Sequence, residues 1–201
     1  MQAPFDRSLL RQRRNRASTN FASHDFLLSE ITDRLLDRLD DIKRPFADIL
    51  NLGCHSGLAG EVIAARADTR FLVQSDLSDK MAFLARNRNN QATITSDEEA
   101  LPFADESFDL IVSALSLHNV NDLPGALIQA NRCLRPDGVF LAAMFGGQTL
   151  TELKEVLMLA ESDTAGGVAL RVSPFADVKD LGNLLQRAGF ALPVADSEII
   201  T

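Results

Sequence analysis

The chain has only two cysteines, Cys54 and Cys133, and they lie far apart in the sequence. Two such residues do not build the disulfide framework of a small secreted protein, so the sequence favours a reducing compartment. No apolar run approaches membrane-spanning length, and the first long apolar segment is broken by charges, unlike a signal peptide. We therefore expect a cytoplasmic protein without a transmembrane segment.

Positive charge is scarce outside the first residues. The formal net charge is −8, but residues 1–16 hold five arginines against the single acid Asp6, so the rest of the chain carries −12. A body of this charge repels backbone phosphates, so nucleic acid is not an expected partner. For the arginine-rich start we expect a solvated, partly disordered terminus, with contact to an acidic partner or a membrane surface as the alternative.

Internal repeats and low-complexity segments are also absent, and 201 residues suffice for a single core. Helical spacing of apolar residues before Pro45 predicts an N-terminal helical segment over 1–44. Over 45–201, alternating patterns predict an α/β fold, a mostly parallel sheet with helices on both faces. The expected strands are 46–52, 70–75, 92–95, 108–115, 137–145 and 190–200; the expected helices are 57–67, 79–89, 122–134, 149–162 and 175–188.

One stretch combines a buried strand with a glycine turn. The apolar run that begins at Phe46 stops at Asn51 and is followed by Gly53 and Gly57, which predicts a strand, a tight turn and a helix start. Glycine lets the backbone approach a ligand closely, and the following helix presents free N–H groups. Such turns also merely join strands to helices, so this corner alone leaves both interpretations open.

A carboxylate at the end of the next strand supports ligand binding. Asp76 follows Gly57 by 19 residues, the interval at which nucleotide-binding α/β domains place an acid that accepts hydrogen bonds from ribose hydroxyls. We therefore expect a ligand that carries a ribose. The alternative is structural, because Asp76 or Ser78 also suits the N-cap of helix 79–89.

Two further groups follow predicted strands on the same side. Asp97 ends the third strand, where a carboxylate suits the exocyclic amino group of a purine, and the apolar residues 101–103 would then wall its ring. A surface acid in a turn is the alternative. His118 follows a buried strand, where a neutral imidazole suits catalysis or substrate contact, and a hydrogen-bonded structural histidine is the alternative.

Two turn features are structural. Asn121 or Asp122 is the expected N-cap of helix 122–134. The run 134–138, Leu-Arg-Pro-Asp-Gly, predicts the turn from that helix into the next strand, with Gly138 taking positive φ.

Together these residues resemble the class I S-adenosylmethionine-dependent methyltransferases. The resemblance covers about 46–145 and is carried by Asn51-Leu52-Gly53-Cys54-His55-Ser56-Gly57, Asp76, Asp97 with Leu101-Pro102-Phe103, the run 107–113 and the run 134–138. It implies a Rossmann-like fold, S-adenosyl-L-methionine as cofactor and S-adenosylhomocysteine as product. It also implies residue roles: Gly53, Cys54 and Gly57 hold the methionine part, Asp76 the ribose, Asp97 and the Glu98 amide the adenine, and Ser113 or its neighbours the amino group.

The sequence departs from this pattern in three ways. Asn51, which belongs to the expected cofactor site, stands where the superfamily has an acid, and this removes a negative charge near the ligand's ammonium and sulfonium. His55 stands where the superfamily has glycine, so its β-carbon intrudes where backbone approaches the ligand. The superfamily's sheet ends in an antiparallel hairpin, whereas this sequence provides only strand 190–200. We therefore expect the last strand to be missing: either the polypeptide is truncated, or the edge is open to a partner or a second copy of the chain.

A closer resemblance is to the respiratory complex I assembly factor family, known as methyltransferases and as arginine hydroxylases. It is carried by Phe5-Asp6-Arg7 with the arginines after it, and by the runs 115–124, 143–150 and 172–175. The malonyl carrier-protein methyltransferases of biotin synthesis are similar but more distant. This resemblance implies a complex I subunit as partner and a location in the cytoplasm, free or peripheral at the inner membrane.

Three functions follow. Methyl transfer needs alignment and exclusion of water rather than a catalytic dyad, with His118 as the candidate catalytic residue. Arginine hydroxylation is the alternative from the resemblance, but oxygen chemistry usually recruits iron through two histidines and a carboxylate. His24, His55 and His118 stand in no His-x-Asp or His-x-Glu pair, so we expect no metal site. The third is a non-catalytic assembly scaffold, which Asn51 and His55 favour.

Overall fold

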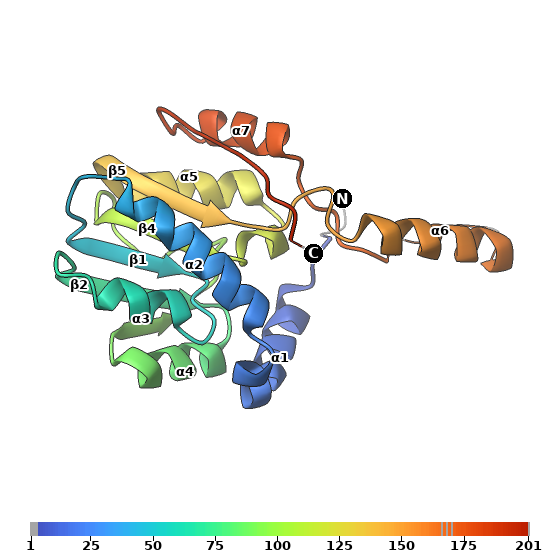
Figure 1. The fold of residues 1–201 in the computed structure, drawn as a ribbon, viewed down its shortest axis with the longest axis horizontal. Coiled ribbons are helices and arrows are strands. Elements are labelled where there is room, and N and C mark those ends of the chain that lie inside the picture. Colours follow the sequence, from blue (N-terminus) through green and yellow to red (C-terminus); the bar gives the residue numbers. More distant parts are fainter. Residues whose placement is uncertain (1–3, 166, 168, 170, 201) are drawn as a thin grey trace.

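A computed structural model describes residues 4–165, 167, 169 and 171–200 of the chain. Five parallel strands form one sheet in the order β3-β2-β1-β4-β5 (Figure 1). The strands are β1 (Asp48–Leu52), β2 (Phe71–Asp76), β3 (Ala92–Thr95), β4 (Phe108–Ala114) and β5 (Leu134–Ala143). The strand order reverses between β1 and β4, and ligands of α/β folds bind at the carboxyl ends of strands near such a reversal.

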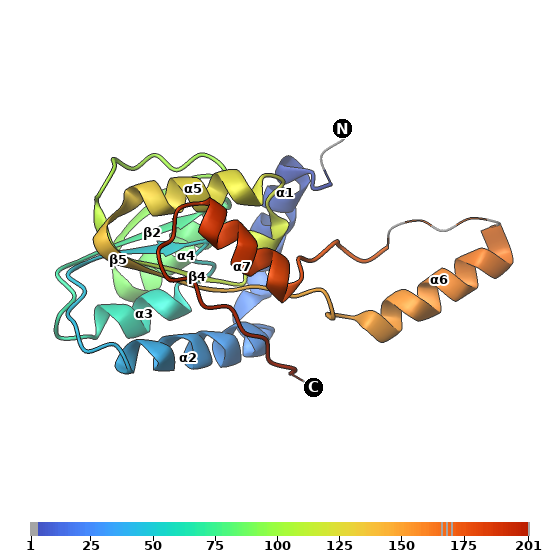
Figure 2. The same ribbon diagram turned by 90° about the horizontal axis from the view of Figure 1, so that it is seen from above.

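Helices cover both faces of this sheet (Figure 2). On one face lie α2 (Phe26–Asp40), α3 (Leu58–Ala64) and α4 (Asp79–Asn89); on the other lie α5 (Leu123–Cys133) and α7 (Val178–Arg187). One core cluster joins α2 and α3 to the sheet, with Leu39, Ile49 and Ile63 fully buried. A second joins α5 to the opposite face through Ile111 and Ala130. The α/β fold predicted from the alternating pattern is confirmed.

The N-terminal segment forms α1 (Arg7–Ala17), the 3-10 helix η1 (Ser18–Ser23) and α2. Asp6 caps α1 by accepting a hydrogen bond from the Leu9 N–H at 2.9 Å. The expected partial disorder is wrong for the described residues, which form helices, whereas most residues of α1 are exposed to solvent as expected. Arg14 is the exception: α1 lies beyond the carboxyl ends of the strands (Figure 1), and Arg14 is only 7% exposed. Whether the chain divides into a segment 1–44 and a domain 45–201 stays a prediction.

Local signals set most helix and strand boundaries. Ser78 caps α4 and Asp122 caps α5, each by accepting a backbone N–H bond. β5 begins at Leu134, earlier than the expected turn allows, and at its irregular start positive φ falls on Asp137 (φ 63°) and not on Gly138 as expected. Aspartate tolerates this region. The glycine is needed for space, since a Cβ there would lie 2.8 Å from the Arg135 carbonyl oxygen.

The predicted strand 190–200 is wrong. These residues form no strand or helix, and Leu192 and Val194 are 92% and 88% exposed. The segment runs back beside α2 (Figure 2), where Glu198 forms an ion pair with Arg34 at 3.0 Å. A strand needs a hydrogen-bonded neighbour, and no strand of the described residues pairs with this segment.

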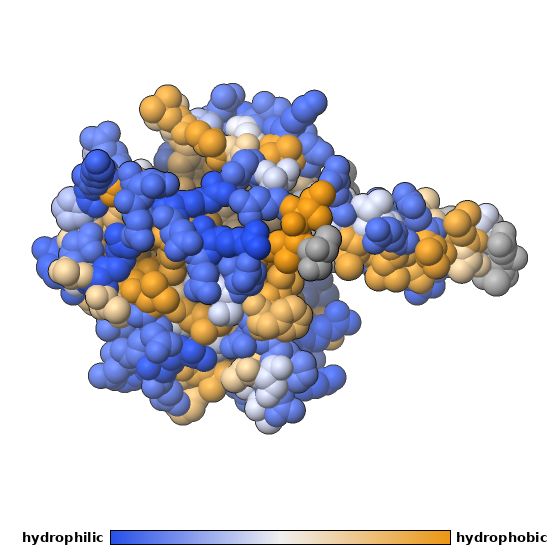
Figure 3. Space-filling view, viewed as in Figure 1, coloured by the Kyte–Doolittle hydropathy of each residue, from blue (hydrophilic) through white to orange (hydrophobic). Residues whose placement is uncertain are grey.

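Helix α6 (Thr151–Ala165) projects from the body (Figures 1 and 2). Leu153, Val156 and Leu159 on it are exposed, and Figure 3 shows an apolar surface along the helix. Among the residues described, none of the helices combines the length and the apolarity needed to span a bilayer.

Candidate functional site

The carboxyl ends of β1, β2 and β4 meet around a glycine loop. Gly53 (φ 69°) follows β1 and Gly57 (φ 85°) precedes α3, so both occupy the left-handed region that favours glycine. A Cβ added at Gly53 would lie 2.2 Å from the Ser116 side chain, and one at Gly57 would lie 2.8 Å from the Ala85 Cα. Backbone and neighbouring residues therefore approach each other here more closely than a larger residue permits.

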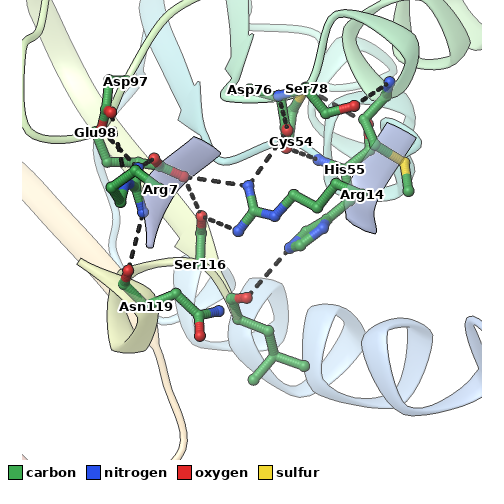
Figure 4. Close-up of polar contacts among 12 residues, drawn as sticks. Arg7, Arg14, Cys54, His55, Asp76, Ser78, Asp97, Glu98, Ser116 and Asn119 are labelled. Carbon is green, nitrogen blue, oxygen red and sulfur yellow. Dashed lines mark hydrogen bonds and ion pairs between the residues drawn. The ribbon is translucent and has the colours of Figure 1, made fainter. Parts of the chain in front are cut away.

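Asp76, the last residue of β2, is 1% exposed and points into this junction (Figure 4). Its Oδ2 accepts a hydrogen bond from the His55 N–H at 3.0 Å, and its Oδ1 accepts one from the Ser78 N–H at 2.8 Å. Ser78 caps α4, so the cap role considered for Asp76 falls to Ser78. The carboxylate is thus a buried, oriented acceptor.

A guanidinium from α1 is the third partner of Asp76. Nη1 of Arg14 lies 3.2 Å from Asp76 Oδ1 and 3.3 Å from Glu98 Oε1, and Nη2 donates to Ser116 Oγ at 3.1 Å (Figure 4). Ser116 donates to Glu98 Oε1 at 2.5 Å. Burial lowers the pKa of Arg14, but the charges of Asp76 and Glu98 outweigh it and the pKa is raised overall. Arg14 therefore stays charged while nearly excluded from water.

A second arginine of α1 binds the neighbouring acids. Arg7 forms an ion pair with Asp97 at 2.5 Å, contacts Glu98, and donates to the Asn119 carbonyl oxygen at 3.0 Å. Burial raises the pKa of Glu98, but Arg14 and Arg7 lower it overall, so this acid is ionised near neutral pH. The carboxylates of Asp76, Asp97 and Glu98 are all paired with α1.

The imidazole of His55 lies between η1 and the end of β4. Its ring stacks on Phe21, with centroids 6.0 Å apart, and its Nε2 lies 3.2 Å from the carbonyl oxygens of Ala114 and Leu115. Burial lowers its pKa, which keeps the ring neutral at pH 7. His55 therefore contributes its backbone N–H to the Asp76 site and its ring to the packing of η1.

His118, in the short 3-10 helix η2 (Leu117–Asn119), belongs to an aromatic group rather than to the Asp76 network. Its ring centroid lies 4.6 Å from that of Phe145 and 5.8 Å from that of Phe175. Its Nδ1 is buried without a hydrogen-bond partner among the described residues. Burial, with the nearby charge of Arg14, lowers the pKa of His118 to about 4, so the ring is neutral at pH 7.

The other predicted site residues lie in or beside the strand ends. Asn51 and Ser113 are each the penultimate residue of a strand, as is Ser75, and all three are at most 1% exposed. Asn51 Nδ2 and both hydroxyl groups have no hydrogen-bond partner in the described part of the chain. Buried polar atoms left unpaired indicate a missing polar ligand or water. Cys54 is buried in the loop, and burial raises the pKa of its thiol.

The sequence analysis missed Arg7, Arg14 and Ser116. A spacing of seven residues places Arg7 and Arg14 two helical turns apart on one face of α1, and this signal was available once a helix was expected there. It could not identify the acids that this face meets, because they lie at the end of β2 and after β3, far along the chain.

Residues 101–103 are expected to wall the purine ring, and this expectation is wrong for Pro102 and Phe103. Leu101 is buried in the core, but Pro102 and Phe103 line a depression of about 650 Å³ together with Asp48 and Arg70. Asp48 begins β1, so this depression lies at the amino end of the sheet. After Asp97 the chain runs back from the carboxyl ends of the strands to their amino ends, where β4 begins. This places Phe103 away from the site.

Comparisons with known proteins agree with this architecture. A family model described as a methyltransferase domain matches residues 50–142. The human protein named arginine-hydroxylase NDUFAF5, mitochondrial, is 43% identical over 98% of this chain and 57% of its own length. The malonyl-[acyl-carrier protein] O-methyltransferase of Laribacter hongkongensis is 31% identical over 97% of this chain and 68% of its own length. The chain thus spans somewhat over half the length of the arginine-hydroxylase relative.

Two solved structures show the same fold. The methyltransferase in a complex with the Haloferax volcanii Trm112 methyltransferase activator has a TM-score of 0.71 and 17% identity, over 88% of this chain and 75% of that one. The S-adenosylmethionine-dependent methyltransferase of Mesorhizobium loti has a TM-score of 0.57 and 22% identity, over 75% and 76%. With its strand order, its glycine loop and these relatives, the chain belongs to the class I S-adenosylmethionine-dependent methyltransferase superfamily.

Proposed function

We propose that this chain contains the cofactor-binding domain of an S-adenosylmethionine-dependent methyltransferase that modifies a protein. The observation that carries the proposal is the position of Asp76. This acid is buried at the end of β2, its two oxygens are oriented by the N–H groups of His55 and Ser78, and it lies beside the Gly53 loop. Nucleotide-binding α/β domains use an acid at this place to bind ribose hydroxyls.

Unpaired polar atoms support the fit of this cofactor. Asn51 Nδ2, Ser75 Oγ and Ser113 Oγ are buried without partners among the described residues, at the ends of three adjacent strands. A cofactor with amino, carboxylate and hydroxyl groups offers partners for such atoms. Asn51 is neutral where an acid is usual, so we expect weaker binding of the cofactor's positive charges than an acid gives.

Each predicted residue then has a role in holding the cofactor. Asp76 accepts hydrogen bonds from the ribose, the backbone of Gly53, Cys54 and Gly57 borders the methionine part, and Ser113 and Asn51 offer polar atoms to the amino group. Asp97 and the Glu98 backbone amide remain the proposed adenine contacts. The bound cofactor supplies a methyl group on a sulfonium, so the protein has only to align donor and acceptor and exclude water.

We place the acceptor beside His118. The aromatic rings of Phe145 and Phe175 surround this neutral imidazole, and its Nδ1 lacks a partner in the described part of the chain. A neutral imidazole with a pKa of about 4 is a weak base at pH 7. We therefore propose that His118 contacts and orients the acceptor, rather than removing a proton from it.

Calorimetry of the purified chain with S-adenosylhomocysteine tests this function. We expect binding, and we expect Asp76→Ala to lose most of it because the ribose hydroxyls lose their acceptor. Asp105→Ala is the matched control, since Asp105 is an exposed acid whose ion pair with Arg132 lies outside the site. An unchanged affinity in Asp76→Ala would rule out this placement of the ribose.

Arginine hydroxylation is the second candidate. Two observations favour it: relatives with 41–43% identity are named arginine-hydroxylases, and the acids at the site already hold guanidinium groups. Among the described residues, no three or more His, Cys, Asp or Glu side chains are grouped so that they could hold a metal ion. That the chain has no metal site stays a prediction.

The setting is proposed from the same relatives. We propose assembly of respiratory complex I, with one of its subunits as the protein acceptor, in the cytoplasm or at the inner membrane. Mass spectrometry of the candidate subunits, with and without the gene for this chain, distinguishes the functions. An added methyl group supports methyl transfer, an added oxygen supports hydroxylation, and an unmodified subunit that still requires the protein supports a scaffold.

A further inference from the structure

We propose that α1 is a latch over the cofactor site, and that Arg14 and Arg7 must leave their acids before the cofactor binds. This inference rests on the proposed function and adds its regulation. The structure shows the latched state, in which the carboxylates of Asp76, Asp97 and Glu98 are paired with one helix (Figure 4).

The hydrogen-bonding capacity of Asp76 makes the two ligands exclusive. A carboxylate has about four acceptor positions. Those of Asp76 already receive the N–H groups of His55 and Ser78 and the guanidinium of Arg14. Two ribose hydroxyls need two positions, and only one is left. Arg14 is the partner that can withdraw, because the two N–H groups belong to the loop and to the first turn of α4.

The space around Asp76 also excludes binding of Arg14 and the cofactor at the same time. The Arg14 side chain is 8% exposed and lies between Asp76, Glu98 and Ser116, while Ser116 fills the space above Gly53. A nucleoside that reaches Asp76 has to occupy the volume that the guanidinium now fills.

Both arginines leave in one motion because they share one face of α1. Arg7 pairs with Asp97, the acid proposed for the adenine, and with the Glu98 carboxylate, two helical turns from Arg14. Release of the helix therefore frees the ribose acid and the adenine acid together.

Helix α1 has little else to hold it. Arg14 is its only buried residue, and Leu9 is 40% exposed, so no apolar side chain of α1 is buried in the core. Its further contacts include polar ones, such as those of Asn15 and Arg11 with Asp79. A segment with few buried apolar contacts opens at low free-energy cost. The paired acids therefore decide whether the latch is closed.

Limited trypsin digestion tests the latch in the unmodified chain. Trypsin cuts after arginine, and Arg7, Arg11 and Arg14 all lie in α1. We expect S-adenosylhomocysteine to accelerate cleavage within α1 while the rest of the chain becomes more resistant. Slower cleavage within α1 would show that the ligand holds the helix in place, and this result overturns the latch.

Calorimetry of Arg14→Gln provides the second measurement. Glutamine can still donate hydrogen bonds to Asp76 and Glu98 but does not form the ion pairs, so a larger fraction of the molecules should have the latch open. We therefore expect this variant to bind S-adenosylhomocysteine roughly fivefold or more tightly than the unmodified chain does. Arg13→Gln is the matched control: it removes the same charge from an exposed position on the same helix, and we expect little change.

The outcomes separate the latch from the function on which it rests. Tighter binding by Arg14→Gln supports both, including the case in which only this variant binds measurably. Weaker binding by a variant whose circular dichroism is unchanged overturns the latch and leaves the methyltransferase function standing, because Arg14 then contacts the cofactor. If neither protein binds, the function and the latch both fail. Should Arg14→Gln not fold, the digestion of the unmodified chain decides.

Discussion

The buried environment of the neutral His118 ring makes the free energy of unfolding depend on pH. Its pKa is lowered to about 4, chiefly by burial and then by the charges of Arg14 and His55, while Glu98 acts in the opposite direction. Between the unfolded value of about 6.5 and pH 4, the unfolded chain binds a proton that the folded chain does not. Stability should therefore fall as the pH drops through this window, by up to about 3 kcal/mol from His118.

The measurement is urea unfolding at pH 7.5 and pH 4.5 of the unmodified chain and of His118→Gln. The variant should lose less stability between these two pH values, because its side chain takes up no proton. His24→Gln is the control, since His24 is exposed. The interpretation is wrong if both variants lose the same amount as the unmodified chain.

Gly57 shows how a single residue fixes the loop. Its φ is 85°, and a Cβ would lie 2.8 Å from the Ala85 backbone. We expect Gly57→Ala to reduce the free energy of unfolding by about 1–3 kcal/mol. Gly182→Ala is the control because Gly182 lies in α7 with nothing near its added methyl group, so it should stabilise by roughly 0.5–1 kcal/mol. A loss of similar size at both positions would contradict the packing at Gly57.

At the scale of elements, the apolar residues of α2 and those of α6 lie in opposite environments. Leu39 of α2 is fully buried, whereas Leu159 of α6 is 68% exposed. Leu39→Ala should therefore cost about 2–5 kcal/mol of unfolding free energy, and Leu159→Ala less than about 0.5 kcal/mol. Chemical denaturation of the two variants checks this. A large loss from Leu159→Ala would mean that α6 packs against the body in solution.

The environment of the charged face of helix α1 depends on other elements of the fold. The acids that it meets end β2 or follow β3, and only the parallel pairing of these strands brings Asp76 and Glu98 together at the carboxyl ends of the strands. Without those acids, the face that carries Arg7 and Arg14 would be solvated.

For the whole molecule, the charge distribution explains why α1 lies against the body. Residues 1–16 carry +4 against a remainder of −12, so the body attracts its own first helix. In this structure the acidic partner considered for the arginines is the same chain.

Ligand linkage should be visible in the stability of the whole chain. S-adenosylhomocysteine at about a hundred times its dissociation constant adds about 2.7 kcal/mol to a protein that binds it only when folded. For a chain of this length, the thermal midpoint should then rise by roughly 5–10 °C. Differential scanning fluorimetry measures this rise, which should persist in Asp105→Ala and disappear in Asp76→Ala. No rise at saturating ligand would contradict the proposed cofactor.

The sequence by itself determined the local features of this protein. Alternating apolar patterns predicted the five strands of the sheet, the caps Ser78 and Asp122 were each one of two candidates, and the interval from Gly57 to Asp76 predicted a site at the strand ends. These features depend on residues close in the chain, so their physical causes are visible in the sequence.

Only the tertiary structure decided the contacts between distant segments. It paired Arg14 with Asp76, placed Phe103 near the amino ends of the strands, and left 190–200 without a neighbouring strand. A guanidinium needs an acid, and a strand needs a hydrogen-bonded partner. In both cases the partner comes from a remote part of the chain, so folding decides whether the two meet.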